Sequence, residues 1–207
     1  MTPSILAEYV IPIVLFVGVV SGVFNLKSKN RYAIFFYLSL SLAIDMTSRF
    51  LSGLQSNNLI LFSFLSFLEI VVFSYMYWEK LKNAWWLQVL IVAGLIYIVF
   101  EAITLDTSDL ANYQTYARNV SSILIVLMAL NYIFSELRAG STLKGDTLHF
   151  VLLFYYSLEF MLLIPFNFLI NASTTSIMYI WTARVILLFI FYSYLTYYLW
   201  SSGKTQK

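Results

Sequence analysis

Seven charged side chains lie within long apolar stretches of this sequence, and the chemistry open to them is the first clue to function. A charge near the middle of a membrane costs about 3 kcal/mol if it faces lipid, so seven would cost roughly 20 kcal/mol. Such side chains must therefore face the interior of a protein, where they can form ion pairs, bind a ligand or conduct an ion or a proton. The sequence thus predicts one polar pocket, whose candidate residues are Asp45, Arg49, Glu69, Glu101, Arg118, Glu159 and Arg184.

The stretch "SLAIDMTSRF" indicates how a helix would position two of these residues. Its polar side chains share one helical face with a serine just beyond it, and the set is Ser41, Asp45, Ser48, Arg49 and Ser52. The spacing i, i+4 lets Asp45 and Arg49 pair on this face. One carboxylate cannot accept all five N–H donors of a guanidinium. We therefore expect a second partner for Arg49, with Glu69 and Glu101 as the candidates.

The elements that carry these residues are predicted to be membrane-spanning helices. Of 207 residues, 61% are hydrophobic and 11% charged, with a mean hydropathy of +0.82, whereas about a quarter of the residues in soluble domains are charged. Apolar runs of roughly 20 residues, enough to cross about 30 Å of hydrocarbon, alternate with short polar segments. We expect an all-α polytopic membrane protein, a bundle of seven transmembrane helices that forms a single domain over residues 1–207 with no soluble domain. The expected spans are 5–24, 33–53, 59–78, 85–104, 115–137, 148–170 and 177–200.

The segments between the spans predict the topology. Asn57 and Asn58 indicate a tight turn, so the second and third spans should form an antiparallel hairpin. Basic residues near span ends remain in the cytoplasm. Nine Lys and Arg residues lie in the segments 25–32, 79–84, 138–147 and 201–207. None lies in the alternate segments 54–58, 105–114 and 171–176. We therefore expect the N-terminus outside, the C-terminus in the cytoplasm and a pocket that opens outward, with the first span retained because no basic n-region precedes it.

The residue content disfavours several function classes. The absence of cysteine excludes disulfides, thiolate catalysis and cysteine-bound metals. The one histidine, His149, falls at the start of the sixth span and is interpreted as an interfacial residue rather than a zinc ligand. Every lysine lies outside the spans, which disfavours a retinal Schiff base, and a net charge of +2 with scattered basic residues does not indicate nucleic-acid binding. Hydrolase, zincin and P-loop motifs do not occur, so we expect neither an enzyme nor a bound cofactor.

Three functions remain open from these patterns. In the first, the outward pocket senses or binds a small ligand, and a cytoplasmic or membrane protein partner receives the signal because the cytoplasmic segments are short. In the second, the chain is a small transporter or channel component, which is favoured by Glu159, by the helix-bending Pro165 and by the similar stretches "FYLSL" and "FYYSL". In the third, the chain is a structural subunit of a membrane complex whose charges lock helix packing. The patterns do not identify a ligand.

Some of these stretches also resemble a known family. The features are Asp45, the turn Asn57-Asn58-Leu59, Glu69 within "FSFLSFLEIVVFSYMYWEKL", and the later stretches "YARNVSSILIV" and "FYYSLEFMLLIP". In these the chain resembles a family of small, uncharacterised multi-pass inner-membrane proteins of Bacteroidetes-type bacteria, some of which are encoded near signalling kinases. The resemblance implies a location in the cell inner membrane and favours sensing, and it supplies no catalytic residues.

Overall fold

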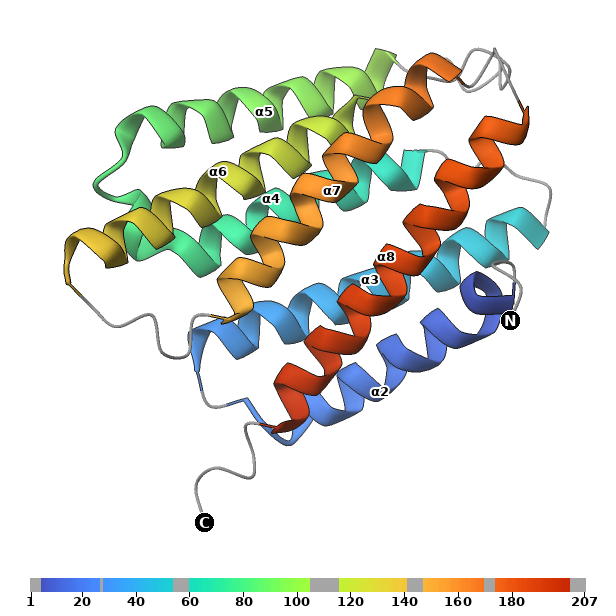
Figure 1. The fold of residues 1–207 in the computed structure, drawn as a ribbon, viewed down its shortest axis with the longest axis horizontal. Helices are drawn as coiled ribbons and strands as arrows, with labels where there is room; N and C mark the ends of the chain where they lie inside the picture. Colours follow the sequence, from blue (N-terminus) through green and yellow to red (C-terminus); the bar gives the residue numbers. More distant parts are fainter. Residues whose placement is uncertain are drawn as a thin grey trace. The chain divides into compact units, whose positions relative to one another are not determined.

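The computed structural model of the chain describes residues 5–26, 28–53, 60–104, 116–140, 147–169 and 174–201, the side chains of 166–169 and 174–176 excepted. Within these ranges every regular element is a helix (Figure 1). A short π-helical turn, η1, precedes the first α-helix. The elements are η1 (Leu6–Val10), α2 (Ile11–Val23), α3 (Lys29–Gly53), α4 (Ile60–Leu81), α5 (Trp85–Thr104), α6 (Ala117–Arg138), α7 (Thr147–Leu169) and α8 (Thr174–Ser201).

The prediction of an all-α fold with seven apolar helices is confirmed for the described residues. Seven helical segments, with η1 and α2 counted together, are long and apolar enough to cross a membrane. The bounds of α5 are those predicted, whereas α3 begins at Lys29 rather than at residue 33. The earlier start has a local cause, because the Ser28 hydroxyl accepts a bond from the Arg31 N–H at 3.4 Å and so caps the polar first turn. The predicted turn at Asn57 and Asn58 lies outside the described residues, and the orientation in the membrane stays a prediction.

The helices divide into two compact units, which we describe separately. Unit 1 comprises residues 1–58 and 173–207 and so contains η1, α2, α3 and α8, whereas unit 2 comprises residues 59–172 and contains α4 to α7. The prediction that all seven helices form a single domain stays a prediction.

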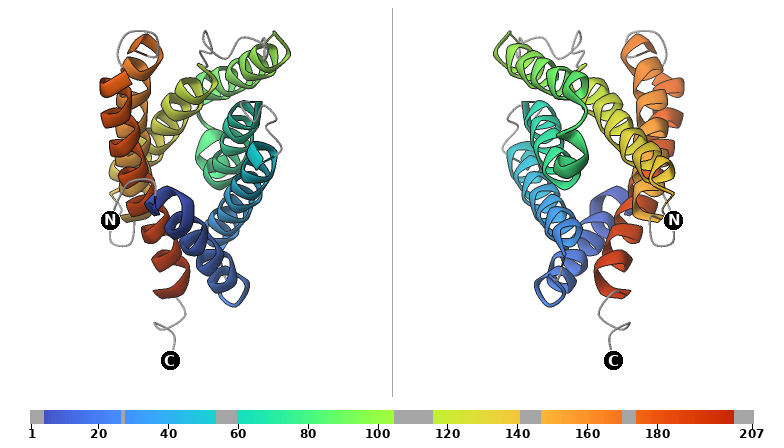
Figure 2. Two further views of the ribbon diagram at one scale, coloured as in Figure 1. Left: turned by 90° about the vertical axis from the view of Figure 1, so that its right-hand side faces the viewer. Right: turned by 90° about the vertical axis from the view of Figure 1, so that its left-hand side faces the viewer.

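In unit 1, α2 packs against both α3 and α8 (Figure 2). Gly18 allows the close approach, since a Cβ there would lie 2.5 Å from Thr196 Oγ1 and 2.8 Å from Leu38 Cδ1. The Thr196 hydroxyl in turn donates a hydrogen bond of 3.1 Å to the Val14 carbonyl. Without a hydrophobic driving force between helices in lipid, small residues of this kind let backbones approach and dispersion forces act.

In unit 2, α6 is the central helix and packs against α4, α5 and α7. Gly94 of α5 faces α6, and a Cβ there would lie 2.5 Å from Leu124 Cδ1. On the α4 and α7 sides the buried side chains include the ring pair Phe73 and Tyr156, whose centroids are 5.6 Å apart. The first turn of α6 thus lies where three other helices can reach it.

Candidate functional site

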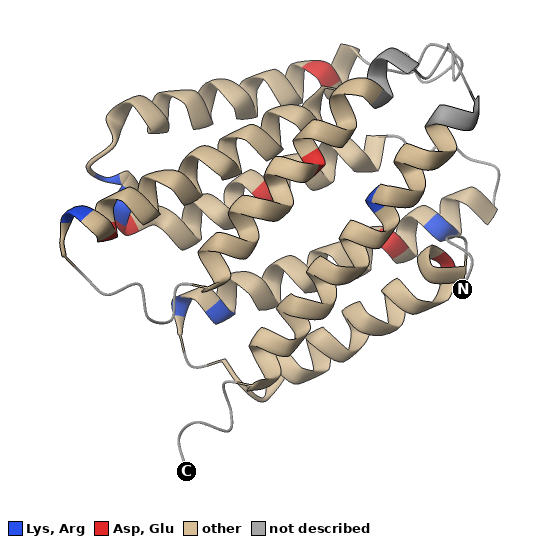
Figure 3. Cartoon of the chain, viewed as in Figure 1, with Lys and Arg blue, Asp and Glu red and all other residues tan. Residues whose placement is uncertain are grey.

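Charged residues occupy only a few positions in otherwise uncharged helices (Figure 3), and three of them meet in the core of unit 2. Arg118 Nε donates to Glu159 Oε1 at 2.9 Å and Arg118 Nη2 donates to Glu159 Oε2 at 3.1 Å. Arg118 Nη1 donates to Glu69 Oε2 at 2.6 Å. The arginine side chain is 3% exposed and both carboxylates are 0% exposed. These three residues, which we name the Arg118 cluster, connect α4, α6 and α7.

Neighbouring hydroxyl groups complete the shell around Glu69. The Tyr156 hydroxyl donates to Glu69 Oε1 at 3.3 Å, and the Ser121 hydroxyl lies 3.5 Å from Glu69 Oε2 and 3.0 Å from the Arg118 carbonyl. A carboxylate removed from water needs such donors on both oxygens, because an unsatisfied buried charge is far more costly than a buried polar group. The Arg118 cluster is therefore a well-bonded buried network.

Glu101 has a different role, which is to cap α6. Its Oε2 accepts a bond from the Tyr116 N–H and its Oε1 accepts one from the Ala117 N–H, both at 3.1 Å. The first N–H groups of a helix have no partner within the helix, and that end carries partial positive charge. Arg118, in the same first turn, adds positive charge there. The carboxylate of Glu101 offsets both effects and holds the start of α6 against α5.

Arg49 forms a second ionic site, in unit 1. Its Nε donates to Asp45 Oδ2 at 2.7 Å and its Nη2 donates to Asp45 Oδ1 at 3.2 Å. The guanidinium also donates to the backbone carbonyls of Glu8 at 2.7 Å and Ala7 at 2.8 Å, both in η1. The predicted pair with Asp45 is thus confirmed. The predicted second partner was a carboxylate, Glu69 or Glu101, but the structure supplies backbone carbonyls instead, which a guanidinium can reach because its donors point in several directions.

The seven candidates thus fall into separate groups. Glu69, Arg118 and Glu159 come together, Asp45 pairs with Arg49, and Glu101 caps a helix, while Arg184 is half-buried in α8. Three of the seven belong to unit 1 and four to unit 2, so convergence of all seven on one pocket stays a prediction.

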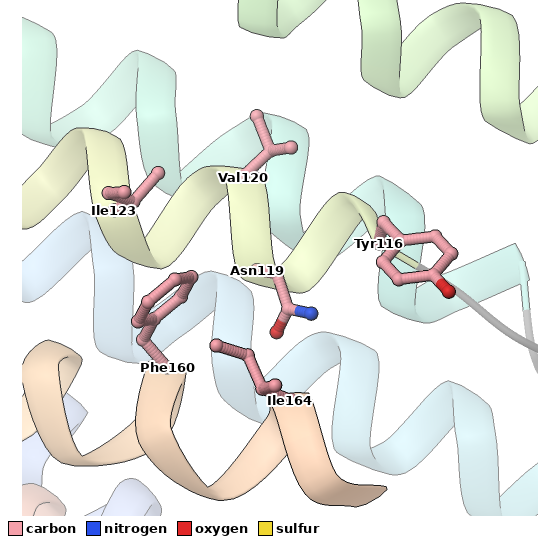
Figure 4. A pocket seen from close by; sticks show the side chains of 6 residues that line it. All are labelled: Tyr116, Asn119, Val120, Ile123, Phe160 and Ile164. Atoms are coloured by element: carbon pink, nitrogen blue, oxygen red, sulfur yellow. The ribbon is translucent and has the colours of Figure 1, made fainter. Parts of the chain in front are cut away.

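A groove on the surface of unit 2 contains none of the seven candidates. It has a volume of about 330 Å³ and lies between α6 and α7 (Figure 4). The N-cap residue of α6 and three side chains of the helix recur in it at i, i+3, i+4 and i+7. The six lining residues are Tyr116, Asn119, Val120, Ile123, Phe160 and Ile164. The lining is therefore apolar apart from one amide and one phenol, whereas the sequence predicted a charged pocket.

Asn119 is the buried polar residue of this groove. Its side chain points toward Ile164 of α7 (Figure 4), and the residue is 8% exposed. Its Oδ1 is buried and has no hydrogen-bond partner among the described residues, whereas most buried polar atoms in proteins do have one. Sequence reasoning missed this residue as a site, although an amide next to Arg118 in an apolar span was a usable signal.

His149 lies near the start of α7, where the sequence places it, and its side chain is buried within unit 2, while its level at a membrane interface stays a prediction. It is 3% exposed. Its Nδ1 lies 3.0 Å from the Tyr77 hydroxyl, and its ring stacks on Tyr132 with centroids 3.8 Å apart. The hydroxyl gives Nδ1 a hydrogen-bond partner, which lowers the cost of burying the ring. Beside Tyr132, Lys80 and Glu136 form an ion pair.

Two further comparisons concern metal binding and similarity to known proteins. Among the residues that the structure describes, no group of three His, Asp or Glu side chains is arranged to hold a metal ion. Comparison of the chain with protein-family models, with curated proteins and with solved structures finds no match.

Proposed function

We propose that this chain is a multi-pass protein of the bacterial inner membrane that senses a small ligand in unit 2 and signals through a protein partner. The observation that carries the proposal is the buried, unpartnered Oδ1 of Asn119 in an apolar groove. An acceptor left without a partner costs about 1–3 kcal/mol. A ligand that donates to this oxygen would remove that cost, which makes the groove a binding site rather than a stabilising feature.

The Arg118 cluster supports coupling of this site to helix movement. Asn119 follows Arg118 on α6 and Phe160 follows Glu159 on α7, so the groove and the bidentate ion pair lie at the same level of the same two helices. A ligand that separates α6 from α7 would stretch the Arg118 to Glu159 bonds of 2.9 and 3.1 Å. Tightly packed helices respond to such changes by shifting as units. The shift would reach the far ends of both helices.

The distribution of basic residues supports the direction of signalling. Lys80 and Glu136 form an ion pair, so α4 and α6 both end on the side away from the groove. In the sequence, the segments 79–84 and 138–147 that follow contain four Lys and Arg residues, namely Lys80, Lys82, Arg138 and Lys144. By the positive-inside rule these ends face the cytoplasm and the groove lies in the outer half. Because the cytoplasmic segments are short, the output is a changed surface that a partner protein reads.

Single-cysteine labelling tests the sidedness of the site, because the native chain has no cysteine. We would label Tyr116→Cys at the groove and Ala139→Cys beyond the other end of α6 with a membrane-impermeant thiol reagent from each side. The proposal expects labelling of position 116 from outside alone and of position 139 from inside alone. The opposite pattern would overturn the orientation, and burial of position 116 from both sides would favour a structural subunit.

Filling the groove tests the coupling. Ile164→Trp adds an indole to the groove and mimics occupancy, so the labelling rate of Ala139→Cys should change severalfold. Ile186→Trp, which replaces an isoleucine that is also exposed but lies on α8, is the matched control. An equal labelling rate in the two variants would rule out transmission from the groove and with it the sensing function.

A small transporter is the second candidate, and Pro165 is the observation that favours it. Pro165 lies inside α7, where it cannot donate to the Met161 carbonyl and so weakens the helix beside Ile164. A helix weakened at a binding site is typical of transporters that alternate their access. Labelling of Tyr116→Cys from either side in turn would select this function over sensing.

A further inference from the structure

We infer that the groove between α6 and α7 binds a membrane-soluble molecule with an apolar body and one hydroxyl group, which donates to Asn119 Oδ1. This inference rests on the proposed function, since it names the class of ligand for the same site. Its basis is the combination of a largely apolar lining with a single buried acceptor that has no partner among the described residues. Apolar walls with a few polar groups that fix orientation are the usual composition of small-molecule sites.

The surroundings disfavour a charged ligand. The lining contains no acidic or basic side chain, and the Arg118 guanidinium directs its Nε, Nη1 and Nη2 groups to Glu69 and Glu159. A charge placed in the groove would lose its hydration without gaining an ionic partner from the lining, which is strongly unfavourable. The ligand is therefore neutral.

The unpartnered oxygen also disfavours a simple hydrocarbon chain. A lipid acyl chain has no donor, so it would cover Asn119 and leave Oδ1 unsatisfied. A hydroxyl group donates to this oxygen and can also accept a bond from the amide N–H of the same side chain. This pairing distinguishes a lipophilic alcohol from bulk lipid.

Size and access agree with such a ligand. A volume of about 330 Å³ is at the lower end of the range for small-molecule sites, which suits a medium-chain or single-ring alcohol. Tyr116, Ile123 and Ile164 are each about two-fifths exposed, so the groove opens on the outer surface of two apolar helices. If these helices span the bilayer, the ligand reaches the groove through lipid.

Photolabelling of the full-length protein in lipid nanodiscs tests the inference. The probes are a medium-chain alcohol that carries a diazirine and the matched diazirine alkane without the hydroxyl, and mass spectrometry locates adducts on α6 and α7. We expect Asn119→Leu to lower labelling of the groove by the alcohol about tenfold, as loss of one hydrogen bond implies, and to leave labelling by the alkane unchanged. Asn131→Leu, at a half-buried asparagine of α6 outside the groove, should leave both unchanged.

Two results would overturn the inference. Equal dependence of both probes on position 119 would show that the groove holds hydrocarbon alone, and equal loss in Asn119→Leu and Asn131→Leu would show a general effect on α6. Failure of the proposed function is distinguishable from either. Alcohol labelling that depends on Asn119 without a change at the Ala139→Cys reporter would refute sensing and leave this site intact. A reporter that responds to Ile164→Trp in a protein that does not discriminate the probes would leave sensing intact and refute the alcohol site.

Discussion

The two arginines Arg118 and Arg49 each lie in an apolar helix, and their guanidinium groups differ in burial and in the partners that they bond. Arg118 is 3% exposed and bonds to carboxylates that lie 41 and 49 residues away in the chain. The side chain of Arg49 is 34% exposed and bonds to Asp45, four residues earlier on its own helix, and to two backbone carbonyls of η1. The first site connects three helices through charge, whereas the second holds the N-terminal turn against α3.

The difference in burial decides what each site contributes. Removal of one member of a buried ion pair leaves an uncompensated charge and costs about 3–5 kcal/mol, whereas a partly exposed pair is screened and contributes about 1 kcal/mol or less. Loss of one member of the Arg118 cluster should therefore destabilise unit 2 strongly, whereas loss of the Arg49 site should act locally. Substitutions at matched positions test this contrast.

The largest effect is expected for Arg118→Met. It would leave Glu69 and Glu159 buried without their cation, so the free energy of unfolding of the purified protein should fall by about 3–5 kcal/mol in a denaturing-detergent titration. Arg138→Met, at the exposed last residue of α6, is the control and should change it by less than about 0.5 kcal/mol. Similar losses in the two variants would mean that the buried network is no more important than a surface charge.

A smaller and local effect is expected for Arg49→Met. Loss of two charge-assisted bonds to carbonyls should cost about 1–2 kcal/mol and should open η1 rather than the whole protein. Amide hydrogen exchange of Leu6–Val10 should accelerate roughly tenfold, whereas exchange in α6 should not change. Acceleration of equal size in both regions would contradict a local role for Arg49.

Asn119→Leu sharpens the comparison within unit 2, because it lies one residue from the satisfied Arg118 and is itself incompletely bonded. Replacement of a buried, unpartnered amide by an apolar side chain of similar size should raise the free energy of unfolding of the ligand-free protein by about 1 kcal/mol. Asn131→Leu is the matched control in the same assay. A destabilised Asn119→Leu variant would mean that the amide supports the fold, and the groove would lose its assignment as a ligand site.

The sequence predicts the helices far better than it predicts their contacts. Each span is detectable because its apolar length is a local property, and the bounds of α5 are recovered without error. Rotation of a helix about its axis is not detectable in the same way, because apolar residues surround it. Phe154 is exposed and Tyr156 is buried on the same helix. Both are large aromatic residues, so their type does not show which of them faces the interior.

The candidate site shows the same limit. An acid and a base four residues apart, as at Asp45 and Arg49, form a pair that spacing alone predicts. The choice of Glu69 and Glu159 as partners of Arg118 depends on how α4, α6 and α7 pack, and on the first turn of α6 being held by Glu101. Tertiary packing also explains why His149 is buried, since Tyr77 is 72 residues away in the chain.

The smallest effect is expected for Asp45→Asn, and it separates the two ionic sites most cleanly. The amide oxygen of asparagine still accepts a bond from Arg49, and the carbonyls of Ala7 and Glu8 still receive the other donors, so the free energy of unfolding should fall by less than about 0.5 kcal/mol. The same acid-to-amide change in Glu159→Gln presents an N–H group to a buried guanidinium and should cost at least about 1–2 kcal/mol in the same titration. Equal losses in the two variants would mean that burial does not distinguish the sites, because each substitution removes one charge and leaves the shape of the side chain almost unchanged.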